Sequence, residues 1–501
     1  MFPRAAKVIM APLLMEGPVL RPTVVLWLLL CLPAGAGAGE VTPSAAEISA
    51  AVKQAAGRHW YGVYFQNRKL GWASEEIRPE GARVAVVWEA VFRISMLGVT
   101  LETRMENEAR YRADGDFAML EGRASLADRD RKQVATGKLV EDRFEVVQDT
   151  NGREAKVTWE LPVASLVEAV PWAAAGRMQP GDWVAFPTAD LTMLERSRQT
   201  VTFLGRRFTG SLLARTEVLE FEIKDERGVT MKTLTTPEGV TLEAGFGPSL
   251  VLRLEDQAQA QKADPSALDL FLASIVPLDR PLEGGKLAAL VRARYRVELP
   301  EGGALPSDAR QQARDLGEGE FELTVDAGET FVDPAPDLGN PRWSACDGTT
   351  GCNAPEVKQA AVVKAGGATG LEAARKLAGF VHAHMKYELG VSYQRADEIL
   401  KEGRGDCLEY ATLLVALCRS LGMTARVVSG IAYAGGEKPG FAYHAWAEVG
   451  HEGRWVALDP TWDAPVDAAH IKLDVEGGYS ALSLLGSIKV KLLEADYSGS
   501  N

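Results

Sequence analysis

The sequence predicts an α+β protein in which β-rich regions precede a C-terminal part that combines helices with strands. Three observations favour this class. Short apolar runs alternate with turn residues over 60–254, a stretch rich in Pro, Gly, Asn and Asp follows at 333–355, and helical periodicity begins only after that stretch. A chain of 501 residues has room for about three domains, so we expect more than one core.

Composition and charge exclude several classes of protein. Hydrophobic residues make up 46% of the chain and charged residues 25%, which argues against disorder and against a polytopic membrane protein. The formal net charge of −13 argues against nucleic acid or an anionic membrane surface as the main partner. The only strongly apolar run, 23–32, is shorter than the roughly 20 residues of a membrane-spanning helix, so no integral membrane span is expected.

Residues 1–38 are predicted to be a secretory signal peptide. Basic residues precede the apolar run and the small residues of 34–38 follow it, with cleavage expected after Ala36 or Ala38. A retained anchor and a lipoprotein modified at Cys31 are the alternatives. The expected location is therefore periplasmic or extracellular.

Two β-rich domains are predicted, over 41–257 and over 266–332. The clearest signal in the first is a hairpin at 60–73, in which two apolar runs flank a polar turn. In the smaller domain, strands are expected at 291–297 and 320–325.

A linker is predicted over 333–356. Cys346 and Cys352 lie in it on either side of a turn-forming loop, and an exported compartment permits a disulfide between them. Two free thiols are the alternative. A zinc site is not expected there, because no further ligands lie at a suitable spacing.

The linker is followed by a predicted helix over 370–386. Thr369 and Glu372 have the spacing of a capping box at its start. His382 and His384 lie two residues apart on this helix, so they point in different directions and are not expected to share a metal ion.

Cys407 is the candidate nucleophile. Gly403 and Gly405 permit a tight turn before it, and an apolar helix begins almost at the cysteine. The positive end of a helix dipole, with a nearby His, lowers the pKa of a thiol from about 8.5 towards roughly 3.5–7.5. Cys418 lies eleven residues further on, about 16 Å along the helix axis, so the two cannot form a disulfide and Cys418 is predicted to be a core residue.

His444 and Asp459 are predicted to face each other across a hairpin. Strands at 441–449 and 454–460 flank a short loop, and a symmetric loop of two or four residues centred on it places His444 opposite Asp459. A nucleophile, a base and a group that orients the base are the parts of a catalytic triad, and Cys407, His444 and Asp459 supply them in that order.

Three segments carry a resemblance to a known family. They read GDCLEYA from Gly405, YHAWAEV from Tyr443 and WVALDPTW from Trp455, and they are similar to the three core motifs of the transglutaminase-like superfamily. The resemblance implies a papain-like catalytic domain, taken here as 357–490, with acyl transfer through a thioester on the cysteine. It implies no cofactor and no metal, and calcium dependence is not carried over. Whether the acyl acceptor is water or an amine stays open.

Other residues around the triad have less defined roles. The backbone amide of Cys407 is one expected donor to an oxyanion, and Tyr393 or Gln394 is a candidate for the second. Trp446, Trp455 and Trp462 are candidates for the wall of a substrate cleft or for the core, and His470 for the rim of the site or for packing.

The predicted function is that of an exported cysteine acyl-transfer enzyme that hydrolyses peptide or isopeptide amide bonds. The alternatives are a crosslinking transglutaminase and a non-catalytic cell-envelope binding or assembly protein with a little-used triad. The expected partners are a protein or peptide substrate, and cell-envelope proteins or peptidoglycan peptides.

Overall fold

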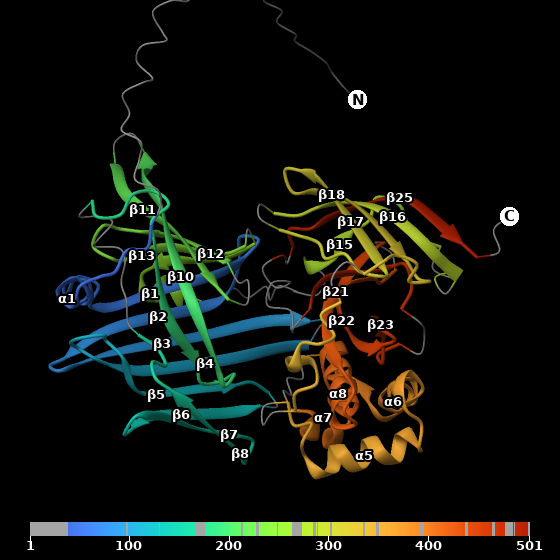
Figure 1. Cartoon of the computed structure of the whole chain (residues 1–501). Helices are drawn as coiled ribbons and strands as arrows, with labels where there is room; N and C mark the ends of the chain where they lie inside the picture. Colours follow the sequence, from blue (N-terminus) through green and yellow to red (C-terminus); the bar gives the residue numbers. More distant parts are fainter. Residues whose placement is uncertain are drawn as a thin grey trace, which may run out of the picture. The chain divides into compact units, whose positions relative to one another are not determined.

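A computed structural model of the protein describes most of the chain from Gly39 to Ser498 (Figure 1). The predicted signal peptide, 1–38, and the candidate residues Tyr393 and Gln394 lie outside the described residues. The described ranges are 39–96, 99–129, 131–165, 176–211, 214–226, 230–247, 249–262, 273–283, 287, 289–300, 303–333, 336–346, 350–389, 395–435, 439–462, 466–475, 484 and 486–498.

The N-terminal β-rich region forms one antiparallel sheet with the strand order β8-β7-β6-β5-β4-β3-β2-β1-β14-β13-β12-β11-β10-β9. Strands that follow each other in the chain pair with each other, and β1 and β14 join the two halves. Helices α1 (Ala45–Gln54) and α3 (Gln257–Ala260) accompany the sheet. The strands are β1 (Gly57–Phe65), β2 (Arg68–Glu80), β3 (Arg83–Met96), β4 (Val99–Arg112), β5 (Met119–Ala127), β6 (Lys132–Val140), β7 (Arg143–Thr150), β8 (Arg153–Glu160), β9 (Trp183–Asp190), β10 (Glu195–Ser211), β11 (Ala214–Asp225), β12 (Thr230–Thr235), β13 (Thr241–Phe246) and β14 (Leu250–Glu255).

The hairpin predicted at 60–73 is confirmed as β1 and β2. Its turn consists of Gln66 and Asn67 alone, whose φ angles are 48° and 63°. Two positive φ angles in sequence match the twist of the flanking strands, which is why so short a turn closes this hairpin.

A second sheet has the order β17-β18-β16-β25. The two strands expected from the sequence are present as β16 (Leu290–Glu298) and β18 (Glu320–Asp326), and β17 (Gln311–Gly317) completes the antiparallel trio. The fourth strand, β25 (Lys489–Tyr497), comes from the end of the chain and pairs with β16. Val490 and Leu492 alternate with exposed residues on β25 and point into the core.

The third sheet has the order β15-β22-β21-β24, with β23 paired to β22. Its strands are β15 (Val276–Pro277), β21 (Ala425–Tyr433), β22 (Gly440–His451), β23 (Arg454–Leu458) and β24 (His470–Val475). The helices of the same region are η3 (Pro341–Trp343), α5 (Pro355–Ala365), α6 (Gly370–His384), α7 (Ala396–Glu402) and α8 (Cys407–Ser420), and a two-stranded pair joins β19 (Lys386–Tyr387) to β20 (Arg404–Gly405). We refer to the sheet formed by β15, β21, β22, β23 and β24 as the catalytic sheet.

Alternate residues of β22 divide between two environments. Ala447 and Val449 pack into the apolar core formed with α5, α6 and α8, which also contains Cys418 as predicted. His444, Trp446 and Glu448 occupy the intervening positions and therefore lie on the opposite face of the catalytic sheet. That second face carries the polar groups of the site.

The second sheet shares a core with the catalytic sheet. Tyr295 of β16 meets Phe441 of β22 edge to face, with ring centroids 5.7 Å apart, and its hydroxyl donates a hydrogen bond of 3.0 Å to the carbonyl of Ala468. Residues 290–326 therefore help to build the support of the catalytic sheet.

A row of buried charges also joins the two sheets. Lys472, which is 1% exposed, forms ion pairs with Asp308 and Glu448. Glu448 pairs in turn with Arg426 at 2.8 Å, and Arg426 with Asp337 at 2.9 Å. We call these five residues the buried ion-pair row.

Three local predictions are settled by these elements. The Cys346–Cys352 disulfide is confirmed, with Cα atoms 5.4 Å apart. The helix expected after Thr369 is present as α6, but the Thr369 side chain makes no capping hydrogen bond, so the predicted capping box is wrong. The described chain is mostly β, and its α+β character lies in the C-terminal half.

The predicted register of the β22–β23 hairpin is wrong. The strands pair Ala447 with Leu458 and His451 with Arg454, so the turn is Glu452 and Gly453, with φ angles of 48° and 79°. β22 runs two residues further than expected because this turn needs only two residues with positive φ. Asp459 lies just beyond the end of the ladder, and not opposite His444.

None of the helices in the described ranges is long and apolar enough to cross a membrane.

Candidate active site

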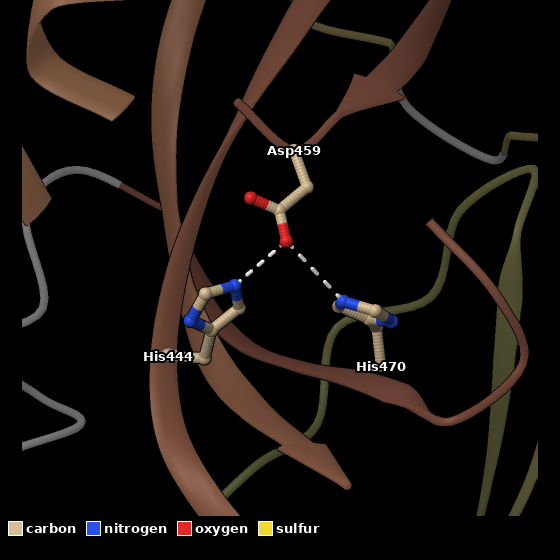
Figure 2. Close-up of side chains that lie close together, drawn as sticks. All are labelled: His444, Asp459 and His470. Atoms are coloured by element: carbon tan, nitrogen blue, oxygen red, sulfur yellow. Dashed lines mark hydrogen bonds and ion pairs between the residues drawn. The ribbon is translucent and has the colours of Figure 1, made fainter. Parts of the chain in front are cut away.

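His444 and Asp459 form a buried pair despite the shifted register. Nε2 of His444 lies 2.8 Å from Oδ2 of Asp459 (Figure 2). Asp459 follows the last residue of β23, and the turn of the chain there brings its carboxylate over the neighbouring strand. The pairing expected from the sequence is thus present, although it is reached by a different route.

His470 approaches the same carboxylate from another direction. Its Nε2 lies 3.6 Å from Oδ2 of Asp459 (Figure 2), and its Nδ1 lies 2.8 Å from Oδ1 of Asp467. His470 is 2% exposed, so it is not a residue of the rim. Its place beside the pair is a feature that the sequence reading missed.

The Asp459 carboxylate is fixed on all sides. Its Oδ1 accepts a 2.8 Å hydrogen bond from the backbone amide of Thr461, and its Oδ2 faces both imidazoles. The carbonyl of Thr461 lies 3.2 Å from Nδ1 of His382 on α6, which ties the loop after Asp459 to that helix. Burial alone would raise the pKa of Asp459, but the two imidazoles outweigh it and hold the pKa well below its usual range.

Small residues on the central strand create room for this cluster. β21 lies between β22 and β24, and it places Gly430 opposite His444 and Ala432 opposite His470. A Cβ on Gly430 would lie 2.6 Å from the Trp446 ring and 2.2 Å from the carbonyl oxygen of Ile471. The two imidazoles therefore lean over the middle strand, with ring centroids 5.8 Å apart.

Cys407 is the first residue of α8. Asp406 caps the helix by accepting a hydrogen bond of 3.0 Å from the amide of Leu408, and the amide of Asp406 donates one of 2.9 Å to the Glu409 carboxylate. The backbone amide of Ala445 donates a hydrogen bond to the Cys407 sulfur. Because Ala445 follows His444 on β22, the thiol lies beside the strand that carries the base.

The environment of the thiol differs from the expected one. Burial, followed by the carboxylate of Asp406, raises the pKa of Cys407 well above its ordinary value, and Glu409 and Asp459 act in the same direction. The Ala445 amide opposes this shift without reversing it. The prediction of a lowered thiol pKa is therefore wrong, because burial of the thiol, together with the charge of Asp406, outweighs the effect of the helix dipole. In the described part of the chain no hydrogen bond joins Cys407 to His444.

Replacing Asp406 with asparagine should lower the pH at which Cys407 becomes reactive. Asparagine keeps the oxygen that caps α8 but removes a negative charge beside the sulfur. We expect the midpoint of iodoacetamide alkylation to fall by about one pH unit, the usual effect of one close charge. The measurement is the alkylation rate of Cys407, followed by mass spectrometry across a pH series.

The matched control is Glu402→Gln, which makes the same change of charge at an exposed position at the end of α7. It should leave the midpoint in place. An equal midpoint in the wild type and Asp406→Asn would show that burial alone sets the reactivity of the thiol.

The candidate cleft residues separate into two groups. Trp446 is 0% exposed and packs against Val428 and Val466, and Trp455 is buried beside Arg426, so neither forms a cleft wall. Trp462 is 40% exposed and stacks on His444, with ring centroids 4.5 Å apart and planes inclined by 10°. Only Trp462 of this set covers the base from the solvent side.

His444, Asp459 and His470 are also the group of described residues that comes nearest to a metal-binding set. Their ligand atoms all lie within 4.8 Å of one another. However, Oδ2 of Asp459 already occupies the space between the imidazoles and is hydrogen-bonded to one of them (Figure 2). A metal ion would have to break that bond, so the arrangement is better suited to orienting an imidazole than to holding an ion.

Comparison with known proteins gives a family for this region. Residues 358–460 match the family model of the transglutaminase-like superfamily, which confirms the resemblance seen in the sequence. A stretch of 105 residues is 29% identical to the human (Homo sapiens) protein named Kyphoscoliosis peptidase; it covers 19% of this chain and 16% of that protein.

Two solved structures show more distant similarity. A protein from Cytophaga hutchinsonii assigned as a cysteine protease matches 42% of this chain and 93% of its own, with 16% identity and a TM-score of 0.29. A protein from Parabacteroides distasonis assigned as a protease matches 69% of this chain and 68% of its own, with 10% identity and a TM-score of 0.20.

Proposed function

We propose that the protein is an exported cysteine acyl-transfer enzyme with a papain-like core, and that it hydrolyses amide bonds of peptides or isopeptides. The observation that carries the proposal is the buried His444–Asp459 pair next to the helix N-terminus that begins with Cys407. The match of 358–460 to the transglutaminase-like superfamily supports the same chemistry.

Cys407, His444 and Asp459 each have a separate role in the reaction. His444 takes the proton from the Cys407 thiol as the sulfur attacks the amide carbonyl, and the tetrahedral intermediate collapses to a thioester when His444 gives that proton to the departing amine. Water then attacks the thioester: His444 takes a proton from the water and returns it to the sulfur, which releases the carboxylic acid. Asp459 keeps the imidazole oriented and stabilises its charged form.

A high thiol pKa fits attack assisted by a general base. Since burial and Asp406 keep the resting thiol protonated, the proton is removed when the substrate is in place, and no stable ion pair has to form first. The backbone amide of Cys407, at the start of α8, is the donor that we expect for the developing oxyanion, where one such hydrogen bond is worth about 2.7–4 kcal/mol.

The surface next to the thiol favours an apolar segment of the substrate. Leu408 is 43% exposed, Trp462 40% and Tyr387 49%, and each lies close to the Cys407 or His444 side of the site. Exposed apolar side chains that gather at a catalytic group are typical of a binding surface. We propose a peptide with aliphatic or aromatic residues near the reacting amide as the substrate class.

Export is proposed from the N-terminal sequence pattern, and the Cys346–Cys352 disulfide supports it. The expected partners are proteins or peptides of the cell envelope.

The choice between water and an amine as the acceptor is open to direct measurement. We expect purified protein under mild reduction to release new chain ends from a mixture of unfolded-protein peptides, even when putrescine is present in excess. Mass spectrometry separates the products, because hydrolysis adds water and transamidation adds the amine. Putrescine adducts in place of hydrolysis would identify a transamidating enzyme, and neither product in the wild type would contradict the proposal.

A further inference from the structure

His470 has no part in the reaction described above, yet it contacts the residue that orients the base. It also lies beyond the segment 358–460 that matches the superfamily. We propose that His470 is a positioning residue. It holds Asp459 from the side away from His444, and its positive charge partly neutralises the Asp459 carboxylate that His444 contacts. This inference rests on the proposed function and deepens it.

The orientation of the His470 ring is set by Asp467. Nδ1 of His470 lies 2.8 Å from Oδ1 of Asp467, and the same oxygen accepts a 2.9 Å hydrogen bond from the amide of Ala469. With Nδ1 fixed in this way, Nε2 is directed at Asp459, 3.6 Å away (Figure 2). Nε2 is buried and has no hydrogen-bond partner in the described part of the chain, so the contact that it makes is the one with the Asp459 carboxylate.

The surroundings prevent the ring from turning away. Arg310 donates one hydrogen bond of 2.5 Å to the carbonyl of His470 and another of 2.8 Å to the carbonyl of Asp467. Trp446 and Trp462 both meet the His470 ring edge to face, with centroids 5.6 Å and 5.3 Å away. Contacts on this many sides are typical of a group that supports a catalytic side chain.

Four ionisable groups face His470. Asp467 lies on its own turn, Asp459 beyond the end of β23, His444 on β22, and Arg310 on the segment before β17. Burial alone would lower the pKa of His470, but the two carboxylates outweigh burial and Arg310 and raise it. His470 therefore carries more positive charge near neutral pH than an exposed histidine does, and this charge partly neutralises Asp459.

Two substitutions separate the contact from the charge. His470→Gln retains an N–H donor for Asp459 but cannot become a cation, whereas His470→Leu removes both. The probe is para-nitrophenyl acetate, whose acetyl group passes to the Cys407 sulfur with release of para-nitrophenolate, so that acylation is measured without knowledge of the natural substrate. The rate is followed from pH 5 to 9, with protein stability checked by thermal unfolding.

We expect the acidic limb of the His470→Gln rate profile to move to higher pH by about one unit, because a cation that opposes protonation of the nearby base is gone. Its plateau should stay within a few-fold of the wild type. The plateau of His470→Leu should fall by about 10–100-fold, as is usual when a supporting group is removed. His451→Gln, at the far end of β22, is the control and should change neither quantity.

The outcomes test the inference separately from the proposed function. An acidic limb that stays in place in His470→Gln would overturn the role of the charge, and an unchanged plateau in His470→Leu would reduce His470 to a packing residue. If instead the wild type and Cys407→Ala react alike, the proposed function fails.

The chain has six histidines, so ¹⁵N-histidine NMR then tests the inference without activity. The His444 signals should titrate at a higher pH in His470→Gln, and an unchanged titration would overturn the inference.

Discussion

Replacing Cys407 with alanine is expected to abolish acyl transfer. The sulfur is the only atom of the protein that forms a bond to the acyl group in the proposed mechanism, and loss of a nucleophile of this kind lowers kcat by about 10⁶-fold. The measurement is the release of para-nitrophenolate and the cleavage of peptides by Cys407→Ala, compared with the wild type at equal concentration.

The fold should survive this change. Cys407 is the first residue of α8, its cap is made by Asp406 and Glu409, and alanine is a good helix former. The free energy of unfolding should therefore change by less than about 1 kcal/mol.

Cys418→Ala is the matched control. Cys418 lies on α8 and is 0% exposed in the core, so its loss should reduce stability but leave the rate per folded molecule unchanged. Activity that disappears in Cys418→Ala and persists in Cys407→Ala would reverse the roles assigned to the two thiols.

The sequence predicted the members of the proposed triad better than the geometry that joins them. His444 and Asp459 do meet, but the register that suggested it was wrong by two residues, because the turn of Glu452 and Gly453 is centred one residue later in the chain than the loop assumed. A hairpin register follows from turn geometry, and a positive φ at Glu452 has no distinctive sequence signal.

The sequence contains a feature that affects the reactivity of Cys407 and that the predicted thiol pKa did not take into account. Asp406 and Glu409 have the spacing of a capping box, which places two carboxylates at the N-terminus of the helix next to the sulfur. Their charges oppose the effect of the helix dipole, and burial adds to them. Which effect dominates the thiol pKa depends on how deeply the thiol is buried, and the sequence alone does not give that burial.

His470 and Lys472 could not have been placed without the strand order. In a single strand that reads His-Ile-Lys-Leu, the alternate positions of His and Lys suggest a face exposed to solvent. In the structure that face is covered by the segment around Asp308 and Arg310, and Arg310 precedes His470 by 160 residues in the chain. Long-range coverage of this kind, like the pairing of β25 with β16, is decided by tertiary structure and not by local pattern.

Lys472→Met is expected to cause a large loss of stability at a position outside the site. The side chain is buried, and its removal leaves the carboxylates of Asp308 and Glu448 without the cation that lies between them. Breaking a buried ion pair by removing one partner usually costs about 3–5 kcal/mol. Urea unfolding at neutral pH measures this loss as a lower transition midpoint.

Lys489→Met is the control for a lysine ion pair on the surface. Lys489 bonds Glu298 on the neighbouring strand, but its side chain is 75% exposed, and exposed pairs of this kind contribute little to stability. Equal losses in the two variants would mean that the buried ion-pair row contributes no more than a surface contact.

The pH dependence gives a second and independent test of the buried ion-pair row. Burial opposes ionisation of Asp308, but Lys472 outweighs it and lowers the pKa of that carboxyl, so the stabilisation is complete above the ordinary aspartate pKa and is lost as the pH falls through the lowered one. Lys472→Met lacks this contribution, so the difference in unfolding free energy between wild type and variant should hold from pH 7 to about 4 and shrink as the pH falls further. Asp308→Asn added to Lys472→Met should recover part of the loss at pH 7, because it removes an unpaired buried charge while its amide oxygen still accepts from the backbone of Arg310 and Gln311. A difference that stays constant with pH would mean that packing of the lysine stem, and not its charge, stabilises the junction between the two sheets.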